Sequence, residues 1–385
     1  MDLLEASGAR HQFDSTVSWL IKGHWQVIKE SDMVYNSKRS ASKDVCNALQ
    51  NKGQDMEDND GLFPSGPDSP TVVHEGDAYD LLNKLPAESV DLIITSPPYW
   101  GHRTYGLAHN WEILDEWISQ GGSKESIPSY DWYRMHGGCL GMEPLPEWYV
   151  SNLAEFFQRG AHALKSQGSM WVNIGDTYFA RWSSIRLDGR QGLGNNPRER
   201  RKTPMGGFRQ EKQLLQIPAR FSIAMQDLRW ILRNDLIWEK QNVPPRPEKD
   251  RLRLAHEHFF HFVKRPKEGR AKYYYDLSAT EPGSRDVVRV NAAPGSDGHS
   301  ATFPVQVIEP RILSSCPPGG LVLDPFCGTG RALAVAARNG RTAIGFEITS
   351  NFSGAARRHL ADTKKFYESN DEDVEKMANK GGYLF

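Results

Sequence analysis

What the chain lacks excludes several classes of protein. No stretch approaches the about 18 consecutive apolar residues of a membrane span, and the N-terminus lacks the pattern of a secretory signal peptide. The four cysteines show neither CxxC pairing nor the spacing of a metal site; they are Cys46, Cys139, Cys316 and Cys327. The sequence therefore predicts a soluble, cytoplasmic protein with free thiols, no membrane association and no metal site.

The chain also lacks a large net charge and a phosphate-binding motif, and both absences bear on what it can bind. The 47 Lys and Arg residues and the 48 Asp and Glu residues leave a net charge of −1. A nucleic-acid-binding surface would therefore have to be a local basic patch. The chain also has no GKS or GKT, so a loop that cradles the phosphates of a nucleoside triphosphate is not expected.

Apolar segments typical of strands alternate with helical patterns over most of the chain. Strands are expected at residues 91–95, 169–178 and 321–323, and a helix is expected at 144–164, with Gly168 as its C-cap. Further strands are expected at 236–238, 258–263 and 342–348. This alternation predicts an α/β sheet of mainly parallel order in a chain long enough for one large or two modest domains.

The strand at 91–95 runs directly into Ser96-Pro97-Pro98-Tyr99. Two consecutive prolines remove two backbone donors and restrict φ, so neither a helix nor a β-ladder can continue. Ligands of open α/β sheets bind at the carboxyl ends of the strands. We therefore expect this stiff corner to form part of a ligand site, with the Tyr99 ring beside it.

A second candidate site is the segment LVLDPFCGTG at residues 321–330, a strand followed by a glycine turn. Gly328 and Gly330 permit positive φ and a close approach of backbone to ligand. Glu347 follows at the end of the next strand, about 20 residues on, where an acid can bind ribose hydroxyls. Because the GxGxxG phosphate fingerprint is incomplete, a nucleoside without pyrophosphate fits better. Taken alone, Asp324 and Gly328 could simply form a tight β–α turn.

Together, TSPPY and DPFCGTG resemble the motifs of S-adenosylmethionine-dependent amino-group DNA methyltransferases. SPPY precedes FCGTG by over 200 residues, which resembles the permuted beta group of that family. The resemblance covers about residues 71–362 and includes the stretches LKSQGSMWVNIGDTY and DRLRLAHEHFFHF. SPPY is the variant most associated with cytosine-N4 enzymes, whereas DPPY and NPPY are more often found in adenine-N6 enzymes.

The resemblance implies a fold, an activity and partners. The fold would be a Rossmann-like methyltransferase fold, a mostly parallel seven-stranded sheet with helices on both faces and a circularly permuted motif order. The activity would be methyl transfer from S-adenosylmethionine to the N4 amine of a flipped-out cytosine in double-stranded DNA. A cognate restriction endonuclease would be a possible partner, and the enzyme would be a monomer or a dimer.

Three other readings of the same motifs stay open to different degrees. Adenine-N6 transfer is the nearest alternative, because SPPY does not exclude it. A DNA-binding homologue without catalysis is less favoured, since Asp324, Gly328, Gly330 and Glu347 are all present. Protein-glutamine methyltransferases also use an xPPY corner, but their glycine turn precedes it.

The family pattern assigns two sets of residues. The target base would be held by the catalytic residues Ser96, Pro97, Pro98 and Tyr99. The cofactor would be bound by Asp77, Phe303, Pro304, Asp324, Pro325, Phe326, Gly328, Thr329, Gly330 and Glu347. Within that set, Glu347 would hold the ribose and Asp77 the adenine amino group.

The catalytic domain is expected at 71–362, between a variable, partly disordered extension at 1–70 and a tail at 363–385. Within it, the long aperiodic segments 101–143, 181–212 and 265–300 are candidate target-recognition inserts, because such loops are usually functional or disordered. The segment 265–300 is short for reading a duplex site, so the other two would share the task. DNA contacts are expected from Trp100, Arg186, Arg190, Arg198, Arg200, Arg201, Lys202, Arg246 and Arg251, although a basic loop can also be an ordinary solvated surface.

Overall fold

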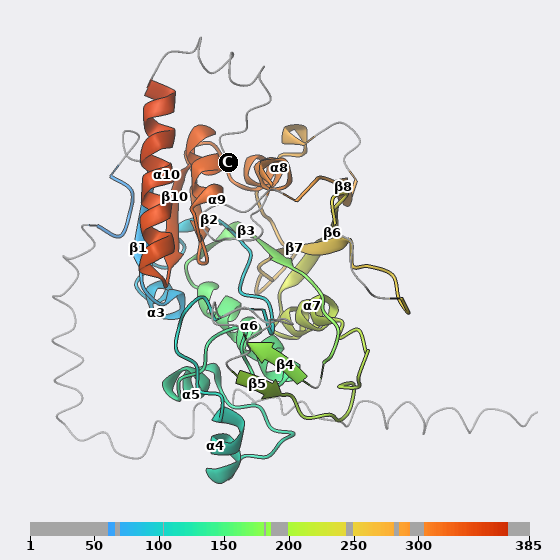
Figure 1. Cartoon of the computed structure of the whole chain (residues 1–385). Helices are drawn as coiled ribbons and strands as arrows, with labels where there is room; N and C mark the ends of the chain where they lie inside the picture. Colours follow the sequence, from blue (N-terminus) through green and yellow to red (C-terminus); the bar gives the residue numbers. More distant parts are fainter. Residues whose placement is uncertain are drawn as a thin grey trace, which may run out of the picture. The chain divides into compact units, whose positions relative to one another are not determined.

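The fold is built on one mixed sheet of eight strands (Figure 1). The computed structural model describes residues 61–65, 70–102, 104–180, 182–185, 199–243, 249–280, 285–292 and 304–368. In sheet order the strands are β1 (Thr71–Glu75), β10 (Thr342–Glu347), β9 (Leu321–Asp324), β2 (Val90–Thr95), β3 (Leu164–Ile174), β7 (His256–Val263), β6 (Ile231–Glu239) and β8 (Val287–Arg289). The predicted N-terminal extension and C-terminal tail lie largely outside the described residues.

The direction of the strands confirms the predicted Rossmann-like class. Strands β1, β10, β9, β2 and β3 are mutually parallel, whereas β7 runs antiparallel to both β3 and β6. The expected number of seven strands is one too low for the described residues. The additional strand β8 has three residues and pairs with the end of β6. A strand this short carries no periodicity that a sequence could reveal.

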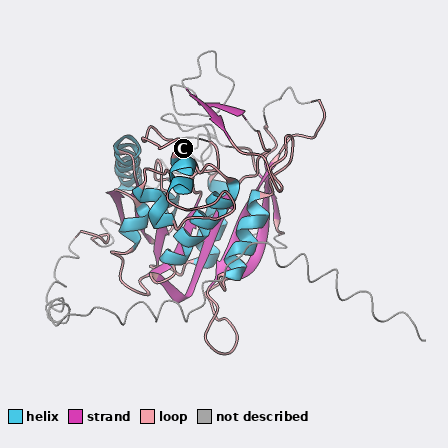
Figure 2. Cartoon of the chain, turned by 90° about the horizontal axis from the view of Figure 1, so that it is seen from below, coloured by secondary structure: helices cyan, strands magenta, loops and turns pink. Residues whose placement is uncertain are grey.

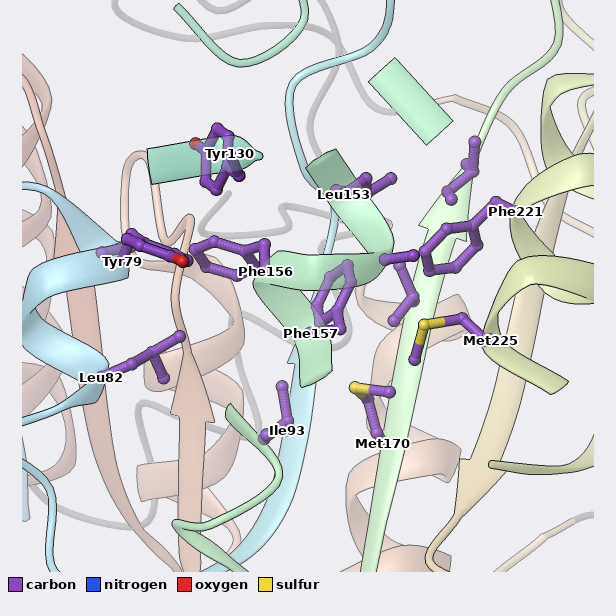
Figure 3. Close-up of a cluster of buried hydrophobic side chains, with 14 of the residues drawn as sticks. Tyr79, Leu82, Ile93, Tyr130, Leu153, Phe156, Phe157, Met170, Phe221 and Met225 are labelled. Atoms are coloured by element: carbon purple, nitrogen blue, oxygen red, sulfur yellow. The ribbon is translucent and has the colours of Figure 1, made fainter. Parts of the chain in front are cut away.

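Helices cover both faces of the sheet because successive strand residues point to opposite sides (Figure 2). Ile93 and Met170 face one hydrophobic cluster, whereas Leu92, Ile94 and Trp171 face the other. The first cluster lies under α3 (Ala78–Leu82), α6 (Pro146–Gly160) and α7 (Ile217–Asp227), where α6 contributes Leu153, Phe156 and Phe157 (Figure 3). The second lies under α8 (Val305–Ser315), α9 (Arg331–Arg338) and α10 (Ser350–Glu368).

The predicted end of the helix at Gly168 is wrong. Helix α6 ends at Gly160, and Gly168 lies inside β3. Val90 pairs with Leu164 and Leu92 with Ser169, so the residues between them bulge out of the ladder. A Cβ on Gly168 would lie 2.9 Å from the Asp91 carbonyl oxygen. Glycine is needed there because the two strands approach closely, not because a helix ends.

The segment 101–143, predicted to be aperiodic, contains two helices, α4 (Ile113–Ser119) and α5 (Tyr130–Met135). Tyr130 and Tyr133 are buried in the first hydrophobic cluster, so this insert is partly core. The segment 181–212 contains a two-stranded antiparallel ribbon of β4 (Trp182–Ile185) and β5 (Glu199–Lys202). Within 265–300 lie the 3-10 helix η2 (Leu277–Ala279) and β8. None of the described helices offers an apolar stretch long enough to cross a bilayer.

His261, in β7, is a buried histidine whose surroundings change the pKa of its ring. Its ring stacks on Trp171 at a centroid distance of 4.5 Å, and its Nε2 lies 3.0 Å from the Ser169 hydroxyl. Burial lowers the pKa of His261 from 6.5 to about 3. The imidazole therefore stays neutral in the fold at pH values at which it is protonated in the unfolded chain.

We predict that His261 weakens the fold in mild acid. Below pH 6.5, the ordinary pKa of histidine, the His261 imidazole binds a proton in the unfolded chain but stays neutral in the folded chain. Urea unfolding of wild type and of His261→Gln at pH 7 and pH 5 checks this. The stability difference between the two proteins should change by about 2 kcal/mol, with wild type losing more. A difference that is independent of pH would contradict this account of His261.

Candidate functional site

The two motifs meet at one cavity of about 950 Å³ at the carboxyl ends of β2, β3 and β9. They meet because β2 and β9 are neighbours in the sheet, with Leu92 opposite Val322. The predicted site residues that line the cavity are Ser96, Pro97, Tyr99, Trp100, Arg251, Asp324, Phe326, Gly328 and Thr329. The cavity therefore joins the proline corner to the glycine turn, as the sequence predicts for a ligand site at this edge of the sheet.

A buried hydrogen bond ties the two motifs together. The Thr95 hydroxyl, one residue before the proline corner, donates to Asp324 Oδ1 at 2.6 Å, and the Phe326 amide donates to the same oxygen at 3.1 Å. Thr95 is fully buried and Asp324 is 4% exposed. Burial raises the pKa of Asp324 to about 7, although the hydrogen bond from Thr95 acts in the opposite direction. The carboxyl is therefore poised between its neutral and charged forms near neutral pH.

The glycine turn has the left-handed backbone that the sequence predicts, with φ of +52° at Gly328 and +81° at Gly330. Glu347 holds this turn, because its Oε2 accepts from the Gly328 amide at 3.1 Å. Its Oε1 accepts from the amide and hydroxyl of Thr349 at 2.9 and 2.8 Å. Burial raises the pKa of Glu347. The carboxylate thus fixes the shape of the turn, and its predicted contact with ribose stays a prediction.

Asp77, predicted to bind an adenine amino group, is engaged by protein groups. Its Oδ1 caps α3 by accepting from the Tyr79 amide at 2.9 Å. Its Oδ2 accepts from Arg134 Nη2 of α5 at 2.8 Å. An amino group bound at Asp77 would share the carboxylate with Arg134.

Some of the predicted residues that the structure describes do not line the cavity. Of the cofactor candidates these are Asp77, Pro304, Pro325, Gly330 and Glu347, and of the catalytic candidates it is Pro98.

The proline corner is supported from behind by residues 141–149. The Tyr149 hydroxyl donates to the Pro98 carbonyl at 2.8 Å, and the Gly101 amide donates to the Gly141 carbonyl at 2.7 Å. The Trp100 indole N–H donates to the Glu143 carbonyl at 3.0 Å. These bonds fix the outer side of the corner, so Ser96 and Pro97 keep a constant position on the cavity wall.

The Tyr99 hydroxyl lies among three polar side chains. It is 2.8 Å from Glu257 Oε2, 2.9 Å from Asn173 Oδ1 and 3.3 Å from Ser96 Oγ. Burial, reinforced by the Glu257 carboxylate, raises the pKa of Tyr99 well above its ordinary value, so the phenol is protonated. A Cβ on Gly175 would lie 2.9 Å from the Tyr99 ring, which explains the glycine after β3.

Among the cavity residues to which the sequence analysis assigns no role are Asn173, Glu257 and Lys240. Lys240 forms an ion pair with Glu257, and both side chains are mostly buried. A signal for two of them was present. Asn173 and Glu257 are polar residues within the apolar strands MWVNI and HEHFFHFV, close to the edge where ligands bind.

Three other residues of the cavity wall have structural contacts. Asp176 Oδ1 accepts from the Ile217 and Thr177 amides, so it shapes the start of α7. The Cys327 thiol is buried, and its pKa is raised well above the ordinary value, which does not suit a nucleophile. Arg251 places its guanidinium 3.7 Å from the centroid of the Tyr178 ring at the cavity wall.

Several predicted residues cannot be placed in the site. Those outside the described residues are Phe303, Arg186, Arg190, Arg198 and Arg246. For Arg200, Arg201 and Lys202 the structure describes only the backbone of β5. Their contacts with cofactor or DNA stay predictions.

Comparison with known proteins identifies the family. A family model described as DNA methylase, of the N6 and N4 type, matches residues 90–358. The chain belongs to this family. The DNA methylase is 34% identical over 297 residues to the Type II methyltransferase M.Cfr9I of Citrobacter freundii, covering 75% of this chain and 87% of that protein. It is 31% identical over 295 residues to M.SmaI of Serratia marcescens, covering 74% and 89%.

Among solved structures, the methylase is similar to the PvuII DNA methyltransferase (cytosine-N4-specific). The TM-score is 0.53 at 19% identity, and the match covers 79% of this chain and 95% of that one. This likeness shows the fold. The family membership confirms the predicted DNA methyltransferase activity on an amino group, with S-adenosylmethionine as the cofactor.

The residues of the cavity fit this cofactor. The volume lies in the range of about 300–1,000 Å³ that is usual for small-molecule sites. S-adenosylmethionine carries a sulfonium and an ammonium group, and the Asp324 carboxyl on the cavity wall suits a cation. Phe326 adds an apolar surface on the same wall.

We predict that Thr95→Val lowers both stability and cofactor affinity. The variant keeps the side-chain shape but removes the donor to the buried Asp324, which should cost about 1.5–3 kcal/mol of unfolding free energy. Chemical denaturation and calorimetric titration with S-adenosylmethionine check both effects. Thr342→Val, which removes a longer bond of 3.3 Å to a backbone carbonyl, serves as the matched control and should change little. Equal behaviour of the two variants would contradict the role given to Thr95.

Proposed function

We propose that this DNA methylase transfers methyl from S-adenosylmethionine to the N4 amine of a flipped-out cytosine at a specific site in double-stranded DNA. The observation that carries the proposal is the position of the Ser96 hydroxyl. It lies on the cavity wall beside Pro97, with Asp324 and the glycine turn on the same cavity. S-adenosylmethionine, when bound, supplies an electrophilic methyl group on a positively charged sulfur.

The chain's own contribution is to hold and polarise the amine. The lone pair of an exocyclic amine is delocalised into the ring, so the amine is a poor nucleophile. Hydrogen-bond acceptors around the NH₂ group, the Ser96 hydroxyl and the Pro97 carbonyl, localise the lone pair and aim it. The two prolines hold these acceptors still, together with the bond that Tyr149 donates to Pro98 and the bond that Gly101 donates to Gly141. Positioning of this kind can lower a barrier by roughly 7–11 kcal/mol, and no covalent intermediate is needed.

The base has to leave the duplex before its amine can reach the cavity, at a cost of a few kcal/mol. Tyr99 and Trp100 line the cavity next to the acceptors and are the residues proposed to contact the flipped base. Arg251 at the cavity wall and the basic residues of the segment 181–212 are proposed to contact phosphates. Positive charge is needed there because the net charge of the chain is close to zero.

Ser96 favours cytosine as the target, since SPPY resembles the cytosine-N4 variant of the motif. Adenine-N6 transfer is the second candidate, because the same acceptors could hold the adenine amine. A restriction endonuclease that cuts the same site is the proposed partner, because the relatives are Type II methyltransferases. We place the reaction in the cytoplasm, with DNA as substrate.

Nucleoside mass spectrometry of DNA from expressing cells distinguishes the two bases. The proposal expects N4-methylcytosine that is absent from cells carrying an empty vector. N6-methyladenine in its place would overturn the choice of base, and no modified nucleoside would overturn the activity. Modification-sensitive sequencing of the same DNA then maps the target site.

We predict that Ser96→Ala lowers turnover roughly tenfold or more and that Tyr99→Ala lowers it further. The first variant loses one acceptor for the amine, and the second loses both the ring and its hydroxyl. Cofactor affinity, measured by calorimetry, should be retained in both variants. Ser278→Ala, on η2 away from the cavity, is the control. Wild-type turnover in both corner variants would show that the corner is not the catalytic site.

A further inference from the structure

A chain of hydrogen bonds leads from the proline corner into the sheet. It runs from Ser96 Oγ to the Tyr99 hydroxyl (3.3 Å) and from there to Glu257 Oε2 (2.8 Å). Asn173 Oδ1 lies 2.9 Å from the same Tyr99 hydroxyl. Lys240 closes the chain by its ion pair with the other carboxylate oxygen of Glu257. The chain joins the corner to β3, β6 and β7, which are distant from it in sequence.

The direction of the bonds follows from which groups can donate. A carboxylate only accepts, and an ammonium group only donates, so Lys240 keeps Glu257 as a charged acceptor. The Asn173 amide nitrogen donates to the His258 carbonyl at 3.1 Å, which leaves its oxygen facing Tyr99. The hydroxyl of Tyr99 therefore has two acceptors beside it, and its single proton points to one of them. Ser96 is left as a donor to the phenol oxygen.

We propose that the Tyr99 hydroxyl, held by Glu257 and Asn173, positions Ser96 for catalysis. Because the Ser96 proton is directed to Tyr99, the lone pairs of Ser96 face the cavity and can only accept. The corner then binds a group that donates, such as an exocyclic amine, and rejects a carbonyl at the same place. This inference rests on the proposed function and assigns the selection of an amino base to the polarity of one hydroxyl.

Tyr99 can act through its ring or through its oxygen, and the variant Tyr99→Phe distinguishes the two. If the ring alone acts, by stacking on the base, Tyr99→Phe behaves like wild type. If the oxygen acts through Ser96, the Ser96 hydroxyl of the Tyr99→Phe variant is free to rotate. It then spends part of the time donating its proton into the cavity. Glu257 and Asn173 touch Tyr99 and not the base in this account, so they are positioning residues.

The test is a double-mutant cycle of Ser96→Ala and Tyr99→Phe, assayed by methyl transfer to DNA that carries the mapped site. Tyr99→Phe alone should lower kcat roughly tenfold, the effect of about one hydrogen bond, with KM for DNA and cofactor affinity unchanged. In the Ser96→Ala background the same change should have no further effect, because there is no hydroxyl left to orient. Tyr273→Phe, whose hydroxyl accepts from Arg233 at 2.7 Å away from the cavity, is the matched control and should keep wild-type kcat.

The possible outcomes lead to different conclusions. A wild-type kcat in Tyr99→Phe, or effects that multiply in the double variant, overturns the inference while leaving the proposed function in place. A Tyr99→Phe variant that raises KM without lowering kcat also overturns it, because the oxygen would then serve binding alone. If wild type transfers no methyl group to DNA in the same assay, the proposed function fails, and the inference fails with it. Thermal unfolding of each variant verifies that the fold is intact.

Discussion

The structure of this site depends on the hydrogen bond between Thr95 and Asp324. These residues stand at the ends of two neighbouring parallel strands, 229 positions apart in sequence, and both are buried. In such an environment an unpaired carboxylate is costly, so the bond fixes the two strand ends relative to each other. The proline corner and the glycine turn begin directly after these residues. Their spacing across the cavity therefore follows from one buried contact.

The rest of the chain holds the proline corner in place from two sides. Residues 141–149 bind the Pro98 carbonyl and the Gly101 amide from behind, and Asn173 and Glu257 bind the Tyr99 hydroxyl from the sheet. The corner thus has little freedom before any ligand arrives. This is what methyl transfer to a weak nucleophile requires, because such a reaction depends on fixed acceptors rather than on a reactive side chain.

The fold class and the two motifs could be predicted from the sequence because their signals are local. Proline pairs, glycine turns and apolar strands can each be recognised from a few neighbouring residues. The sequence does not place Asn173, Glu257 and Lys240 together, since they come together only through the pairing of β3, β6 and β7. The sequence wrongly predicts a helix end at Gly168, because the close approach of β2 and β3 that requires a glycine there is a tertiary contact. Strand β8 is too short to show a hydrophobic periodicity. In segment 101–143 the residues that become buried are scattered among polar ones, so no periodicity is seen there either.

The central claim is that the proline corner and the glycine turn place the base amine and the methyl donor in one cavity. A crystal structure of the protein with S-adenosylmethionine tests this most directly. The account predicts the methionine part beside Asp324 and the methyl group directed across the cavity towards Ser96 and Pro97, with space for a base between them. A cofactor bound elsewhere, or with its methyl group directed away from Ser96, would contradict the account.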